Sequence, residues 1–192
     1  MNRTILPSLA LLTLLGCTAD RNERTIALTV DGAGGRTVYF DRFENNRPIR
    51  VDSVTLDANG KGAMTIPALP LDFYRLALDN DQMILALDSA ESLVLETSIG
   101  QLSMPKSVQG SPSSEALHHF YQDARAYDDE RTKLTGVITN GGDTAAIRRL
   151  NQLNASYYEK CKAFAVDHAS SPAALTALGK LSMQQELGLF KQ

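Results

Sequence analysis

The sequence has no tryptophan, and aromatic residues make up only 6% of its 192 residues. Sugar-binding surfaces usually stack rings on aromatic side chains, so this composition argues against a carbohydrate-binding domain. Neither sign of charge dominates, because 19 Lys and Arg residues stand against 22 Asp and Glu residues, for a net charge of −3. Nucleic-acid-binding surfaces carry excess positive charge, and we therefore do not expect a nucleic acid as partner.

Cysteine is also scarce: the chain has only Cys17 and Cys161, and it has no Cys-x-x-Cys motif. Dithiol exchange needs an attacking and a resolving thiol, which this pair of distant cysteines does not provide. The sequence has no Gly-x-Ser-x-Gly motif, and Gly32-Ala-Gly-Gly35 lacks the Lys-Ser of a phosphate-binding loop. We therefore assign no catalytic residue, no cofactor and no metal site, and we expect that the chain is not an enzyme.

The first 16 residues have the pattern of a secretory signal peptide. Arg3 supplies a positive start, and an apolar stretch from Ile5 to Leu15 follows, which is too short to span a bilayer as a helix. Leu14-Leu-Gly-Cys17 then resembles the bacterial lipoprotein signal, in which a small residue precedes a cysteine that is lipidated and becomes the new N-terminus. We predict a lipoprotein signal peptide over residues 1–16 and lipidation of Cys17; the alternative is ordinary signal cleavage with a chance cysteine.

Acyl chains on Cys17 would hold the protein on a membrane surface without a spanning helix, since several chains together are much harder to extract than one. Residues 17–23 are short and polar, and we interpret them as a tether. Thr18 follows the cysteine, where some bacteria place an acidic residue that retains lipoproteins at the inner membrane. We therefore expect a lipid-anchored protein of the cell envelope, with the outer membrane favoured over the inner membrane.

Residues 24–110 have the pattern of about eight short strands joined by turns, typical of an antiparallel β-sandwich or barrel-like domain. Asn59-Gly60 predicts a tight hairpin between a strand over Val51–Asp57 and a return strand over Lys61–Ile66. Asp79-Asn-Asp81 predicts a second hairpin. Parallel βαβ units are disfavoured because no helix intervenes. The other predicted strands are Thr25–Val30, Arg36–Phe43, Phe73–Leu78, Met83–Leu87, Leu93–Thr97 and Leu102–Val108.

Residues 111–192 change to a helical period and predict three amphipathic helices, which makes the fold class α+β. Ser111-Pro112 marks the start of the first helix, and Asn140-Gly-Gly142 marks its end. Asp143 is the expected cap of the second helix, and Ser170-Ser-Pro172 separates it from a third, with Leu175, Leu178 and Leu181 on one face. Such helices are not stable alone, so we expect them to pack on the sandwich or on a missing C-terminal domain.

Three stretches carry a resemblance to a known family: Val51-Asp-Ser-Val-Thr-Leu-Asp-Ala-Asn-Gly-Lys61, Phe73-Tyr-Arg-Leu76 and Val108-Gln-Gly-Ser111. In this order after a lipoprotein cysteine, they resemble the N-terminal domain of unknown function that precedes the thioredoxin-like domain in envelope thiol-disulfide oxidoreductases of Bacteroidetes. The resemblance covers about Ile26 to Leu181. It implies a role in thiol-disulfide exchange, but the thioredoxin-like domain that carries the redox cysteines is not in this sequence, so no catalytic residue is implied here.

Among residues that could carry chemistry, His118 and His119 are adjacent on the first predicted helix and point about 100° apart, so they do not readily bind one metal. We expect one histidine beside the sheet and the other in solvent. Asp128-Asp-Glu130 is expected to be a solvated helix face, and Asp79-Asn-Asp81 a turn with no calcium-loop spacing. Cys161 lies on an apolar stripe and is expected to be a buried, inert thiol; the alternative is a mixed disulfide with a partner, with Lys160 and Lys162 favouring the thiolate.

Two functions from different classes follow. The first is a non-catalytic, lipid-anchored envelope module that binds a protein partner or positions an oxidoreductase, with an exposed apolar patch around the third helix. The second is the N-terminal part of a thioredoxin-like disulfide reductase whose catalytic domain follows Gln192. Leu187, Leu189 and Phe190 near that end have the composition of a segment that becomes buried.

Overall fold

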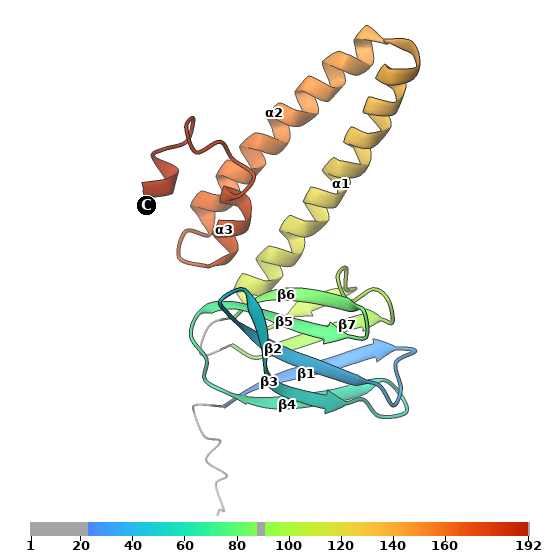
Figure 1. The fold of residues 1–192 in the computed structure, drawn as a ribbon, viewed down its shortest axis with the longest axis vertical. Helices are drawn as coiled ribbons and strands as arrows, with labels where there is room; N and C mark the ends of the chain where they lie inside the picture. The colour runs from blue at the N-terminus through green and yellow to red at the C-terminus, as the bar shows by residue number, and fades with distance from the viewer. Residues whose placement is uncertain (1–22, 88–90, 192) are drawn as a thin grey trace, which may run out of the picture.

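The computed structural model describes residues 23–87 and 91–191, which we call the described residues. They form a body of eight strands and a helical part that projects from it (Figure 1), which confirms the predicted α+β fold class. The signal peptide over residues 1–16 and Cys17 lie outside the described residues. The strands are β1 (Glu23–Asp31), β2 (Thr37–Glu44), β3 (Arg47–Thr55), β4 (Lys61–Pro67), β5 (Asp72–Leu78), β6 (Asp81–Leu87), β7 (Leu93–Ser98) and β8 (Ser107–Gln109).

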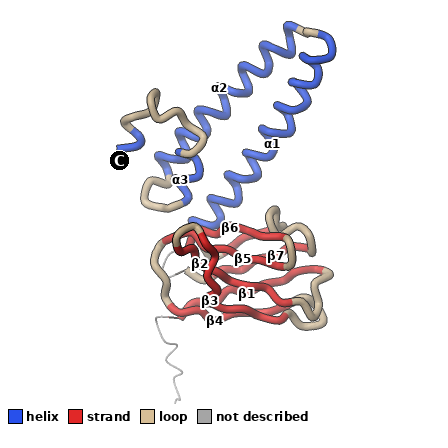
Figure 2. The backbone as a smooth tube through the Cα atoms, viewed as in Figure 1, coloured by secondary structure: helices blue, strands red, loops and turns tan. Residues whose placement is uncertain are grey.

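The body consists of two four-stranded sheets, with strand orders β4-β1-β7-β8 and β3-β2-β5-β6 (Figure 2). In most strands, alternate residues face inward, as the period of two requires; β3 contributes only the partly buried Val51 and Val54. These inward side chains form one apolar cluster that draws on both sheets, including Ile26, Phe40, Leu76 and Leu95, all fully buried. The Phe40 and Tyr74 rings stack with centroids 5.4 Å apart. The strand-rich half is therefore a sandwich with one continuous core.

One pair of strands is parallel, which differs from the expected antiparallel sheets. β1 runs antiparallel to β4 but parallel to β7, from Ile26 opposite Leu93 to Asp31 opposite Ser98. A parallel pair needs a long crossover between its strands. Here the crossover consists of β2 through β6 and contains no helix. The sequence pattern predicted parallel strands only where a helix intervenes, and therefore did not predict this parallel pair.

The Asn59-Gly60 turn forms, but the hairpin predicted around it is wrong. Gly60 has a positive φ of 76°, and its backbone N–H donates to the Asp57 carbonyl at 2.9 Å. However, β3 pairs with β2 and β4 pairs with β1, so the turn carries the chain from one sheet to the other. The reason is that the turn packs on β1: the Val30 N–H donates to the Gly60 carbonyl at 2.8 Å.

A different turn closes the hairpin of β3. Asn45 and Asn46 both have positive φ, 50° and 60°, the conformation that a two-residue hairpin turn requires. Strand β3 therefore starts at Arg47 and pairs with β2 throughout, rather than starting at Val51. The hairpin predicted at Asp79-Asn-Asp81 is confirmed, since β5 and β6 pair antiparallel across it.

The helices are α1 (Pro112–Gly141), α2 (Thr144–Asp167) and α3 (Ala173–Leu178), followed by a short 3-10 helix over Leu189–Lys191. The predicted ends of α1 and the predicted cap of α2 are confirmed, whereas α3 has Pro172 at its N-cap position and no side-chain cap. The Ser111 hydroxyl accepts from the Ser114 N–H at 3.2 Å, Gly142 ends α1 in the left-handed region, and the Asp143 carboxylate accepts from the Ala145 N–H at 2.8 Å. Helix α3 is only six residues long and ends at Leu178, so Leu181 of the predicted face lies outside it; Leu178 and Leu181 pack on the Cys161 cluster, whereas Leu175 is 61% exposed.

The helical part meets the sandwich at one end only. The Ser114 hydroxyl donates to the Ala86 carbonyl of β6 at 2.8 Å, and Leu117 packs against Ala86 and Ala173. Beyond this contact, α1 and α2 run away from the body as an antiparallel hairpin, and α3 folds back beside it (Figure 1). Packing on the sandwich is therefore observed, through the first turns of α1. No helix among residues 23–87 and 91–191 combines the length and apolar character needed to cross a membrane.

Candidate functional site

Cys161 lies in a small apolar cluster that joins the three helices. Its side chain is 1% exposed, and it packs with Phe120, Ala165 and Ala177. Burial raises the pKa of the Cys161 thiol above its ordinary value, although a hydrogen bond from Tyr157 and the charge of Lys180 act in the opposite direction. The neutral thiol is therefore the stable form, as an inert cysteine requires.

The two lysines beside Cys161 in the sequence do not favour its thiolate. The Lys160 amine lies 3.2 Å from the Asp123 carboxylate, and the Lys162 amine lies 3.1 Å from that of Glu186. The cation that acts on the thiol is instead Lys180, which follows α3. Sequence reasoning missed it because Lys180 lies beyond the end of α2 and comes close to Cys161 only when α3 folds back onto α2.

The two adjacent histidines occupy different environments. His118 is buried beside the sandwich, while His119 is exposed. Gln122 bridges them: its side-chain amide donates to His118 Nε2 at 2.9 Å, and its carbonyl oxygen lies 3.3 Å from His119 Nδ1. Burial lowers the pKa of His118, and the neighbouring His119 adds to this effect. Within the described residues, no group of three or more His, Cys, Asp or Glu side chains could hold a metal ion.

The two aspartates of the Asp79-Asn-Asp81 turn form contacts within the sandwich. The Asp79 carboxylate pairs with Arg36, and Asp81 accepts hydrogen bonds from the backbone N–H groups of Leu102 and Ser103, which holds the loop after β7. This anchoring explains why β8 starts only at Ser107 and not at Leu102.

In the Asp128-Asp-Glu130 stretch, Asp128 and Asp129 are exposed and Glu130 is half-buried. The Glu130 carboxylate lies 2.8 Å from the Arg149 guanidinium of α2, so this residue links the two helices.

Sequence reasoning missed a buried carboxylate, Asp41, which is 1% exposed on β2. Its two oxygens accept from Arg50 Nε of β3 at 2.5 Å and from an Arg75 terminal nitrogen of β5 at 2.6 Å. Phe40 pairs with Leu76 and faces the core, whereas Asp41 pairs with Arg75 on the opposite face of the sheet, where the two arginine side chains bury it. Burial raises the pKa of Asp41, but the hydrogen bonds and charges of the two arginines outweigh it, so this pKa lies below its ordinary value.

The signal for this cluster was an aspartate within an apolar, aromatic strand, with arginines on two other segments. Because the three side chains satisfy one another, the cluster has a structural role: it ties together three neighbouring strands of one sheet.

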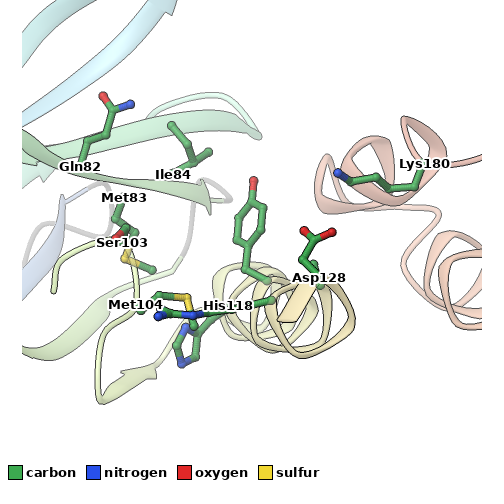
Figure 3. A pocket seen from close by; sticks show the side chains of 11 residues that line it. Gln82, Met83, Ile84, Ser103, Met104, His118, Asp128 and Lys180 are labelled. Atoms are coloured by element: carbon green, nitrogen blue, oxygen red, sulfur yellow. The ribbon is translucent and has the colours of Figure 1, made fainter. Parts of the chain in front are cut away.

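A cavity of about 410 Å³ lies where the sandwich meets the helices (Figure 3). Its apolar wall comes from Met83 and Ile84 of β6, Met104 of the loop before β8, and Tyr121 and Ala124 of α1. His118 lies at the same wall. On the far side, Asp128 extends in the direction of Lys180 (Figure 3).

The charged lining of this cavity consists of Arg125 and Asp128 of α1 and Lys180 beyond α3. Four segments therefore meet here: β6, the loop before β8, the first half of α1 and the residues just after α3. The cavity combines a sandwich wall with charged helix residues, and we call it the junction cavity.

Comparisons with protein-family models, with curated proteins and with solved structures find no match for this chain. The resemblance to the N-terminal domain of envelope oxidoreductases therefore stays a prediction, based on the motifs quoted above. The class that the described residues define is an α+β protein, a two-sheet sandwich with a projecting helical hairpin.

Proposed function

We propose that this chain is a non-catalytic, lipid-anchored module of the cell envelope that binds or positions a protein partner acting in thiol-disulfide exchange. One observation carries the partner-binding part. Around α3 and the residues after it, three large apolar side chains are more than half exposed: Leu175 at 61%, Met183 at 61% and Leu187 at 51%. Exposed apolar side chains that gather in one region are typical of protein-interaction surfaces.

The arrangement of the fold supports a positioning role. Strands β1 and β4 lie on the side of the body away from the helices, whereas β6 lies next to the helices (Figure 1). A membrane anchor attached through residues before β1 would therefore hold the sandwich near the membrane and the helical hairpin away from it. This orientation would present α3 to a partner in the periplasm. The lipid anchor itself rests on the sequence motif at Cys17.

A second candidate is the N-terminal part of a disulfide reductase whose catalytic domain follows Gln192. The observation that favours it is at the end of the described chain, where Leu189 and Phe190 are half-buried and Leu187 is exposed. Apolar residues placed there could pack against a domain that follows.

The intact mass of the native protein, extracted from its own membranes, distinguishes these proposals. A mass that corresponds to acylated Cys17 through Gln192 supports the lipid-anchored module. A mass larger by a whole domain supports the second candidate. A chain that is cleaved but carries no acyl group contradicts lipid anchoring.

The partner surface is tested by a photo-crosslinking residue at Leu175, with the same residue at Val94 as the matched control. Val94 is a 46% exposed apolar residue of β7, on the sandwich. We expect a discrete product from position 175 whose partner, identified by mass spectrometry, carries a Cys-x-x-Cys motif. Equal crosslinking from both positions would contradict a specific surface at α3.

A further inference from the structure

We propose that the junction cavity binds a small amphiphilic anion: an aliphatic carboxylate whose tail lies against Met83, Ile84 and Met104 and whose carboxylate pairs with Arg125 and Lys180. This proposal concerns a ligand site and does not depend on the partner or the membrane anchor. It rests on three properties of the cavity: its size, its apolar wall and the state of its charged groups.

The size and the wall fit an aliphatic chain. A volume of about 410 Å³ is within the range of pockets that hold small organic ligands. Two of the wall residues are methionines, whose unbranched thioether side chains adjust to the shape of a ligand. The buried His118 does not add charge at neutral pH, because its pKa is lowered from an already near-neutral value. The end of the cavity next to the sandwich is therefore uncharged and largely apolar, with Gln82 and Ser103 as its polar side chains (Figure 3).

The charged groups give the sign of the ligand. Arg125 and Lys180 line the cavity, and neither forms an ion pair within 4.0 Å among the described residues. By contrast, Lys160 and Lys162 of α2 both have carboxylate partners. Two cations left without a carboxylate beside an apolar wall are complementary to an anion with an apolar body.

The acidic group of the cavity does not cancel this charge. The Asp128 carboxylate lies 3.3 Å from the guanidinium of Arg131, one turn further along α1. Arg131 also lines a neighbouring cavity of about 370 Å³ that shares Asp128 and Lys180 with the junction cavity. The local sum over Arg125, Arg131, Lys180 and Asp128 is therefore positive, and an apolar cation is disfavoured.

Methionine methyl NMR tests the proposal with internal controls. The full chain is labelled with ¹³C at the methionine methyl groups and placed in zwitterionic phospholipid nanodiscs. It is titrated with decanoate and, for comparison, with decanol and decyltrimethylammonium, which have an alkyl tail but a neutral and a positive head group. We expect decanoate to shift the signals of Met83 and Met104. Met64, buried in the sandwich, and Met183, exposed after α3, should not shift. We expect decyltrimethylammonium to bind at least about tenfold more weakly, since it replaces an attractive charge with a repulsive one.

Two variants and a matched control locate the site. Lys180→Met should weaken decanoate binding about tenfold, the size expected for one charge-assisted hydrogen bond. Lys133→Met removes a lysine of α1 that does not line the cavity and should bind as the unchanged protein does. Ala124→Phe should abolish binding by filling the cavity, with the Met64 signal reporting that the sandwich remains folded.

The proposal is overturned if decanoate shifts all methionine signals alike or none of them, or if decyltrimethylammonium binds as well as decanoate. It is also overturned if Lys180→Met binds decanoate as tightly as Lys133→Met. These outcomes leave the proposed partner-binding role untouched, because that role is read from crosslinking at α3.

Discussion

Asp41 is a buried charged residue of the sandwich, paired with two arginines. A buried carboxylate is costly unless its partners satisfy it, and here Arg50 and Arg75 approach it from the two neighbouring strands. Removing the carboxylate leaves both guanidinium groups without their partner inside the same sheet. The cluster therefore couples the register of β2 to that of β3 and β5.

Asp41→Asn is expected to lower the free energy of unfolding by about 3 kcal/mol, because breaking a buried pair from one side costs several kcal/mol and the half-exposed Arg50 regains some hydration. Urea unfolding followed by circular dichroism measures the change. The control is Asp129→Asn, an exposed residue of α1, which should change stability by less than about 0.5 kcal/mol. Equal effects of both substitutions would contradict the structural role of Asp41.

The contribution of Asp41 to the free energy of unfolding should decrease as the pH falls. The pKa of Asp41 is lower in the folded protein than its ordinary value, so its stabilisation is complete above the unfolded pKa and is lost as the pH falls through the folded pKa. We expect the stability difference between the unchanged protein and Asp41→Asn to stay constant from about pH 7 to pH 5 and to shrink below about pH 4. A difference of the same size at pH 3 and pH 7 would rule this out.

Cys161 should react with alkylating reagents only when the helical part opens. Its thiol is buried and its pKa is raised, so both access and thiolate formation oppose the reaction. We expect iodoacetamide to modify Cys161 at least about 100-fold more slowly in the native protein than in urea. Mass spectrometry of the peptide that contains Cys161 measures the rate. Comparable native and unfolded rates would instead favour the reactive, partner-bound thiol.

At the scale of elements, the turn at Gly60 decides how the two sheets connect. A Cβ at Gly60 would lie 2.2 Å from the Val30 carbonyl oxygen, whereas a Cβ at Gly35, which has the same φ of 76°, would meet nothing within 4 Å. Gly35→Ala should therefore cost about 1 kcal/mol from backbone strain alone. Gly60→Ala should cost at least about 3 kcal/mol, because β4 must also move away from β1.

Urea unfolding of the two alanine variants measures this difference. Since the backbone strain is the same in both, the difference between them reports the close approach of the turn to β1. Variants of equal stability would mean that the turn can move off β1 at little cost.

The same elements show what the sequence could and could not predict. The helix ends at Ser111, Gly142 and Asp143 were predictable because a cap is a contact between residues a few positions apart. Strand pairing was not, because the partner of a strand depends on residues far away in the chain. For this reason the Asn59-Gly60 turn was predicted while its pairing was wrong.

The candidate site follows the same rule. The apolar pattern of its helix correctly predicted that Cys161 is buried, and one buried and one exposed histidine were expected, but only the structure shows that His118 is the buried one. The junction cavity combines β6, the loop at Met104, α1 and Lys180, and no local pattern links these segments. Likewise, the partners of Asp41 come from two other strands of the sheet.

At the scale of the whole molecule, the helical hairpin depends on the sandwich at one end only. The first turns of α1 pack on β6, while near the far end Val137 is 49% exposed and Ile147 is 41% exposed. We expect amide hydrogen exchange to be slowest in residues 114–121 and about 10- to 100-fold faster in residues 132–141. Uniform protection along α1 would mean that the far end is covered by another surface.

Strand β1 has a mechanical consequence for a protein held by its N-terminus. β1 lies between β4 and β7 and is hydrogen-bonded along both edges. A pull on the chain before Glu23 would act along the axis of β1, so hydrogen bonds of two ladders would share the force and break together, rather than one after another as at a sheet edge. The sandwich would then resist tension at the end by which a lipid anchor would hold it.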